Sequence, residues 1–364
     1  MHSRDENVDR DEPPVVVPVT ADPEGDEELI AAGPRLPRWL VLAVIAVAVA
    51  SGLTALVLKN DGHPTAAPSP SPTPSVISPA PEGLADLSVQ DFAINHAGEL
   101  YVLTSPPERL VSVDPDRSIR ARVRAPVGAK LVVADPPGDL VWVIVPHRGI
   151  SDVSIYAGPT MAAVGQLQVS ATVVAAAALE DQLFMATDRG IYRGWPGGTA
   201  TQLQGYTGPV QAIAADPPRF RLLAVSKSYD LIRVGEDTAQ KVRKLTSVRA
   251  KSIVVTDDDH IWLVGFGQPS GSRIGSLDPQ TLDVTLLEPG DPQADRGAIG
   301  WTGGSVFWVE YADSASLVCM DGSTGLASGT YSETDAPVVS VPGVIYAVRG
   351  TGVVKLPSPT ACRG

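Results

Sequence analysis

Short apolar segments with an aromatic residue at the centre recur along most of the chain. Consecutive centres are 38 to 46 residues apart, and six of the seven are aromatic. The seven central residues are Tyr101, Trp142, Phe184, Leu223, Trp262, Trp308 and Tyr346. A period near forty residues is typical of proteins that stack copies of one small β-sheet.

A second, alternating segment follows each aromatic one. Three of its copies are alike: L-V-S-V-D-P-D from Leu110, I-G-S-L-D-P-Q from Ile274 and L-V-C-M-D-G-S from Leu317. Asp followed by Pro or Gly is turn chemistry, so each of these strands is expected to end there. A run of small apolar residues precedes each aromatic segment, and a polar alternating segment ends most repeats, as in R-A-R-V-R from Arg120.

This pattern of inner, aromatic, alternating and polar strands predicts an all-β fold, a seven-bladed β-propeller over residues 84–364. One blade cannot bury both of its faces, so neighbouring blades stack into a ring. A two-sheet sandwich or an irregular all-β domain is the alternative, but sandwiches rarely repeat such a pattern seven times. No polar strand follows Val353 to Leu356, so we expect Val76 to Leu87 to supply the outer strand of the last blade.

The repeats resemble those of NHL-repeat, lactonase-like and virginiamycin-B-lyase-like propellers. The matching segments are I-G-S-L-D-P-Q-T, L-V-S-V-D-P-D, G-E-L-Y-V and D-H-I-W-L, and the resemblance covers Leu84 to Leu356. Enzymes of that superfamily bind metal through His, Glu, Asp or Asn on one face. We carry none of those residues over, because the matched motifs report blade geometry rather than chemistry.

An uncharged segment of twenty residues, Trp39 to Leu58, precedes the repeats. As a helix it would span the hydrocarbon layer of about 30 Å, so the lipid bilayer is a predicted partner. Arg35 and Arg38 precede it and Lys59 follows it, which favours a cytoplasmic N-terminus and an outside propeller at the cell membrane. A cleaved signal peptide is the alternative, but it needs a short basic leader and a shorter apolar core.

The segments on either side of this stretch differ in composition. Residues 1–38 contain ten acidic side chains against four Arg, which predicts a disordered acidic tail. Residues 59–83 contain a P-S-P-S-P-T-P run, which favours polyproline II and predicts a semi-rigid stalk. The Ala-, Val- and Pro-rich composition resembles that of actinobacterial proteins.

Residues suited to catalysis are scattered. His96 and His260 follow inner strands of distant repeats, and His147 follows an aromatic strand and so falls on the opposite face. We expect turn residues rather than metal ligands. The acidic turn Asp257 to Asp259 would suit Ca²⁺, although a solvated turn is the simpler interpretation. The sequence has no nucleophile elbow, zinc-binding His-Glu-x-x-His or phosphate loop. It therefore predicts no cofactor and no catalytic residue.

A binding or scaffold module for an envelope protein or a glycan is the function that this pattern favours. A lactonase- or lyase-like enzyme with a metal site in the propeller channel is the alternative. The net charge of −13 argues against nucleic acid as a partner, because phosphates need a basic face.

The loops after the aromatic segments are a candidate binding face, because a propeller places them at one end of the ring. Six of the seven carry a cation: Arg109, Arg148, Arg189, Lys227, Arg273 and Arg349. The same loops hold six acidic residues, so their net charge is zero and chance is the simpler explanation. Tyr229 and Tyr311 are candidate contact aromatics there.

The two cysteines of the chain, Cys319 and Cys362, both lie near the end of the sequence. The residues aligned with Cys319 in two other repeats are Ser112 and Ser276, so the strand does not need sulfur for packing. Outside the cell a pair can stay oxidised, which predicts a Cys319–Cys362 disulfide. Two unpaired core thiols are the alternative.

Overall fold

The computed structural model describes residues 88–116, 118–255, 260–266, 272–287, 296–302, 305–311, 315–321, 327–332, 334–341 and 344–356. All of them belong to one compact unit, Pro70–Gly364. The predicted tail, membrane helix, stalk and closing segment lie outside the described residues and stay predictions. Within the described ranges, no helix is long and apolar enough to cross a membrane.

The described residues form seven sheets, and the first four cover the N-terminal part of the unit. Sheet one is β1 (Val89–Ile94), β2 (Leu100–Thr104), β3 (Arg109–Val113) and β4 (Ile119–Arg124). Sheet two is β5 (Leu131–Ala134), β6 (Leu140–His147), β7 (Ile150–Ala157) and β8 (Ala163–Val169). Sheet three is β9 (Val173–Leu179), β10 (Gln182–Thr187), β11 (Gly190–Gly194) and β12 (Thr201–Gln202). Sheet four is β13 (Gln204–Gly205), β14 (Val210–Asp216), β15 (Arg221–Ser226), β16 (Asp230–Val234) and β17 (Thr238–Lys244).

Three more sheets follow. Sheet five is β18 (Arg249–Val255), β19 (Ile261–Phe266), β20 (Ser272–Leu277) and β21 (Val284–Leu287). Sheet six is β22 (Arg296–Thr302), β23 (Ser305–Tyr311), β24 (Ala315–Asp321) and β25 (Ala327–Ser332). Sheet seven has three described strands, β26 (Thr334–Val341), β27 (Val344–Arg349) and β28 (Gly352–Leu356). The short helix η1 (Pro217–Arg219) lies between β14 and β15.

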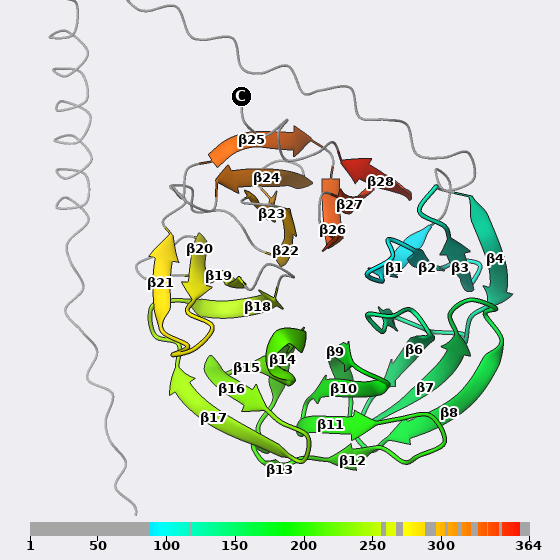
Figure 1. Ribbon diagram of the computed structural model, residues 1–364, viewed down its shortest axis with the longest axis horizontal. Coiled ribbons are helices and arrows are strands. Elements are labelled where there is room, and N and C mark those ends of the chain that lie inside the picture. Colours follow the sequence, from blue (N-terminus) through cyan, green and yellow to red (C-terminus); the bar gives the residue numbers. More distant parts are fainter. Residues whose placement is uncertain are drawn as a thin grey trace, which may run out of the picture. The chain divides into compact units, whose positions relative to one another are not determined.

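The sheets follow one another around a ring, as Figure 1 shows. The first long strand of each sheet contacts that of the next, in the order β1, β5, β9, β14, β18, β22 and β26. The last of these, β26, contacts β1, so the series closes. Consecutive strands within a sheet are antiparallel neighbours, which is the order that the four-part sequence repeat predicts.

The apolar core lies between neighbouring sheets rather than inside any one of them. Each of the five described core clusters combines residues of two adjacent sheets, including sheet seven with sheet one. The centres of the aromatic repeat all lie in the second long strand of their sheets, and Trp142 and Trp262 are almost fully buried. Burying one such side chain stabilises the fold by about 2–3 kcal/mol.

Buried polar residues fix the turns that leave three of the inner strands. Asn95, Asp135 and Asp216 each occupy the turn after the inner strand or its last position, and each is at most 2% exposed. The Asn95 side chain accepts a hydrogen bond from the Glu99 amide at 2.9 Å, and Asp135 accepts one from Leu140 at 3.1 Å. These side chains satisfy backbone donors that a sharp turn would otherwise leave unpaired.

The connection between sheets three and four is unusual, and the sequence repeat does not predict it. β13 joins the outer edge of sheet four as a parallel neighbour of β17, although it comes directly after the last strand of sheet three. Gly205 has a φ of +104°, and a Cβ there would lie 2.4 Å from the carbonyl oxygen of Ala239. Glycine is therefore required where the two backbones approach.

Candidate functional site

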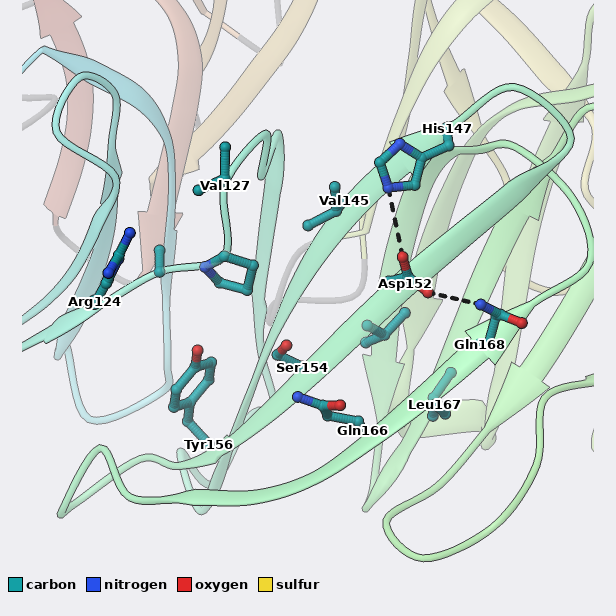
Figure 2. Close-up of a pocket in the computed structure, with 13 residues that line it drawn as sticks. Arg124, Val127, Val145, His147, Asp152, Ser154, Tyr156, Gln166, Leu167 and Gln168 are labelled. Carbon is teal, nitrogen blue, oxygen red and sulfur yellow. Dashed lines mark hydrogen bonds and ion pairs between the residues drawn. The ribbon is translucent and has the colours of Figure 1, made fainter.

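A groove runs between the outer parts of sheets one and two. Its volume is about 930 Å³, and Figure 2 shows its lining residues. One wall is the end of β4 and the following connection, where Val127 is 67% exposed. The rest comes from β6, β7 and β8 of sheet two. The groove exists because the outer strands of two blades diverge, and their inner strands pack together.

Strand alternation gives the groove a polar floor. Along β7, Val153 and Ile155 point into the core between sheets two and three, so Asp152 and Ser154 face the opposite side. Gln166 lies opposite Ser154 in the register, and Gln168 lies opposite Asp152. Two rows of hydrogen-bonding groups therefore cross the floor.

One of these rows is already hydrogen-bonded within the protein. His147 Nε2 lies 3.4 Å from one carboxylate oxygen of Asp152, and Gln168 donates to the other at 2.9 Å; Figure 2 marks both contacts. Gln166, in the neighbouring row, has no hydrogen-bond partner among the described residues, and its side chain is exposed. Its amide can therefore both donate to and accept from a bound molecule.

Tyr156 lies at the end of the floor opposite His147, as Figure 2 shows. Its ring packs in the core between sheets one and two, and it is 7% exposed. Burial raises the pKa of the Tyr156 phenol, and the interaction with Ser154 only partly offsets this rise. The phenol therefore keeps its proton at neutral pH. A buried ring beside exposed amides is the combination of apolar and polar contacts that binding clefts use.

The groove contains Ser, His and Asp side chains, but it does not arrange them for nucleophilic catalysis. In a catalytic triad the His lies between the Ser and the Asp. Here Asp152 contacts His147, and Ser154 lies two residues further along β7. No described contact joins Ser154 to His147. The described residues also contain no group of three or more His, Cys, Asp or Glu that could hold a metal ion.

The structure places the predicted binding face at one end of the sheets. Its residues lie at or beside the connections between the second and third long strands: Arg109, Arg148, Arg189, Tyr229, Arg273, Tyr311 and Arg349. Two acidic residues at the same end are paired within the protein: Asp188 accepts a hydrogen bond from the Thr172 amide at 2.9 Å, and Asp230 pairs with Lys241 at 2.7 Å. Several of the charges at this end therefore hold the fold together. Whether this face binds a ligand stays a prediction.

The predicted disulfide also stays a prediction. Cys319 lies in β24, opposite Phe307 and Gly329, and Cys362 lies outside the described residues. The acidic turn Asp257 to Asp259 is outside them as well. His96 and His260 follow inner strands and His147 ends β6, so they lie at different sheets, as the repeat indicates.

Sequence reasoning missed the groove. Its walls are far apart in the chain, and no motif joins Arg124 to Gln166. The available signal was the polar alternation of residues 163–169, one of the polar segments that end most repeats. His147 was interpreted as a turn residue, whereas it is the last residue of β6 and pairs with Asp152.

Comparison with known proteins defines the fold class. No family model matches the sequence, and no curated protein matches it. Solved structures do match. Kuenenia stuttgartiensis hydrazine synthase is 11% identical with a TM-score of 0.59, covering 75% of this chain and 96% of that one. Virginiamycin B lyase of Staphylococcus aureus is 12% identical with a TM-score of 0.57, covering 74% and 94%. The β-propeller domain of Cps50 (Swd1) from Myceliophteria thermophila is 12% identical with a TM-score of 0.58, covering 74% and 97%.

These neighbours are β-propellers, so the chain has an all-β, propeller-like fold. At such identities the likeness shows the fold alone. A chain in a structure of the mitotic checkpoint complex is also similar, with 12% identity, a TM-score of 0.60 and coverage of 82% and 98%.

Proposed function

We propose that this protein is a membrane-anchored, extracytoplasmic propeller of seven blades that acts as a binding or scaffold module for an envelope protein or glycan. The groove between sheets one and two is its docking site. The observation that carries the proposal is the floor of that groove, where exposed Gln166 lies between a buried tyrosine and an internally paired His147–Asp152 unit.

An extended segment of a protein is the occupant that the groove suits best. Amides of the Gln type match backbone N–H and C=O groups, which an extended segment presents at regular intervals. The exposed Val127, which lines the groove, would cover apolar side chains of that segment. A glycan would use the same hydrogen-bonding groups, so it is the second outcome of the test.

An enzyme of the lyase type is the less favoured function. One structural neighbour is a lyase, but its likeness to this chain is limited to the fold. In the described ranges, neither a triad nor a metal-binding cluster is present at the groove. We therefore propose binding, not turnover, at this site.

The proposed anchor is residues 39–58, which would hold the propeller outside the cell on a stalk. Protease added to intact cells is expected to remove the C-terminal domain and to leave the N-terminal tail protected. Protection of the C-terminal domain instead would refute this orientation.

The docking proposal is tested with a photo-reactive amino acid at Gln166 in the full-length protein. The matched control is the same amino acid at Gln240, an exposed position on the outer strand β17 of sheet four. Irradiation of cells should link one discrete partner from position 166 and not from 240. Identical products from the two positions, or none from either, would contradict the proposed site.

Gln166→Ala and Tyr156→Phe distinguish docking from proximity. Gln166→Ala should weaken retention of the linked partner by about tenfold, because a hydrogen bond at the centre of the groove is lost. Gln240→Ala should leave it unchanged. Retention unaffected by both groove substitutions would mean that the partner only passes near the groove.

A further inference from the structure

A second hollow of about 430 Å³ adjoins the end of the groove. It is lined by Pro107, Glu108, Arg109, Arg122, Val123 and Arg124. Arg124 also lines the groove, so the two hollows meet at the end of β4. The three arginines are exposed and come from two adjacent strands of sheet one.

The three arginine side chains share one face of sheet one. Leu110 and Val123 point into the core between sheets one and two. Arg109, Arg122 and Arg124 alternate with them, so they point the other way. Arg109 lies directly opposite Arg124 in the register of β3 and β4. Like charges in directly opposite positions destabilise a sheet, so fold stability does not explain why Arg109 and Arg124 face each other.

Several other cations of the described residues have acidic partners, whereas some, such as Arg233, have none. Arg120, on the same strand, pairs with Glu99 and Asp114. Arg193 pairs with Asp237 at 3.0 Å, and Arg243 pairs with Asp283 at 2.7 Å. In contrast, no carboxylate of the described residues lies within ion-pair distance of Arg109, Arg122 or Arg124. Glu108 lines the same hollow without such a pair.

We propose that this arginine hollow binds carboxylates of an acidic, extended segment of the partner protein. The proposal rests on the proposed function, because it assigns the chemistry of the segment that continues from the groove. A guanidinium presents paired N–H donors that match the two oxygens of a carboxylate. Three such groups in one hollow favour a segment with several acidic side chains.

The charge of the part of the chain that holds the propeller decides between an acidic peptide and a larger polyanion. Residues 1–38 contribute −6 to the net charge of −13, so residues 39–364 carry −7, which repels an extended anionic surface such as a membrane or a long sulfated glycan. A short acidic segment places its charge only against the three arginines. The field of the rest of the molecule then acts on the segment at longer range, where salt screens it.

The test measures binding of a labelled Glu/Ser peptide of about eight residues to the full-length protein in detergent. A peptide with Gln in place of Glu is the matched ligand. The acidic peptide should bind at least about tenfold more tightly than its Gln counterpart at low salt, and raising the salt should remove the difference. Equal binding of the two peptides would overturn the proposal.

The protein variant is the triple substitution of Arg109, Arg122 and Arg124 to Gln. Arg233→Gln is the control, since Arg233 is exposed on β16 with no ion pair among the described residues. The triple variant should lose the preference for the acidic peptide, and the control should keep it. A folded triple variant that keeps the preference would also overturn the proposal.

Two further outcomes separate this inference from the proposed function. If heparin competes better than the acidic peptide in the same arginine-dependent way, the hollow binds polyanions generally and our assignment is wrong. If the partner linked from Gln166 is retained by the triple variant as by the wild type, the docking function stands and the arginine hollow has no part in it.

Discussion

The carboxylate of Asp91 accepts a hydrogen bond from the backbone amide of Val132 at 2.8 Å, which joins the inner strands of sheets one and two. Asp91 follows an irregularity in β1, where the register with β2 shifts between Val89 and Asp91. Burial raises the pKa of Asp91 from 3.8 to about 7, although backbone amides oppose the rise. An ionisable group therefore holds a junction between blades.

Replacement of Asp91 by Asn should change how stability depends on pH. Because the folded-state pKa of Asp91 exceeds that of the unfolded chain, the folded protein binds the proton more tightly. The protonated Asp91 carboxyl therefore stabilises the folded protein fully below about pH 4, and this contribution is lost as the pH rises through about 7. Asp91→Asn keeps an oxygen for Val132 and should raise the free energy of unfolding by about 1–2 kcal/mol at pH 8, with little effect at pH 4.

Denaturant unfolding across this pH range measures the effect. Asp188→Asn is the control, because Asp188 is an exposed carboxylate that also accepts a backbone amide. An Asp91→Asn variant whose stability keeps the wild-type dependence on pH would show that Asp91 does not titrate near neutrality.

Loss of Arg221 should destabilise the junction between sheets four and five. Its Nε lies 2.7 Å from Asp216, which is fully buried, and its Nη2 donates to the carbonyl oxygen of Pro279 at 2.6 Å. Arg221→Met would leave a buried carboxylate with Arg219 alone, at 3.1 Å. We expect a loss of about 3 kcal/mol in the free energy of unfolding. Arg233→Met, on the exposed side of β16, should change it by less than about 0.5 kcal/mol.

Deletion of Val76 to Leu87 tests the predicted closure of the ring. Sheet seven has three described strands, and β28 is at its outer edge. If the deleted residues supply the fourth strand, their loss should expose β28, lower the melting temperature and promote aggregation. A deletion variant that melts like the full protein would show that the predicted register is wrong.

The predicted Cys319–Cys362 disulfide is tested by mass spectrometry of the protein without reduction. A bond between the two cysteines should be found, and Cys362→Ser should lower the melting temperature. The chain-entropy estimate for a loop of this size is about 4 kcal/mol, which is an upper bound for the effect. Two free thiols, or a bond to another chain, would contradict the prediction.

Most of the fold could be predicted from the sequence because each sheet is formed by strands that follow one another in the chain. Tyr101, Trp142 and Trp262 mark the second strands as their spacing predicts, and Leu223 occupies the same position without an aromatic ring. The groove and the arginine hollow depend on contacts between blades, which no local pattern reports. The arginines of β4 were visible as an alternating strand, but only the register shows that Arg124 lies opposite Arg109.

The parallel strand β13 has a mechanical consequence. The amide of Leu203 bonds to Ile191 in sheet three at 2.9 Å, and that of Tyr206 bonds to Ala239 in sheet four at 2.9 Å. The segment between them is thus hydrogen-bonded to both sheets. A force that separates these sheets would act along β13 and shear its hydrogen bonds to β17. Sheets three and four should therefore yield together, as one unit, when the ring is stretched.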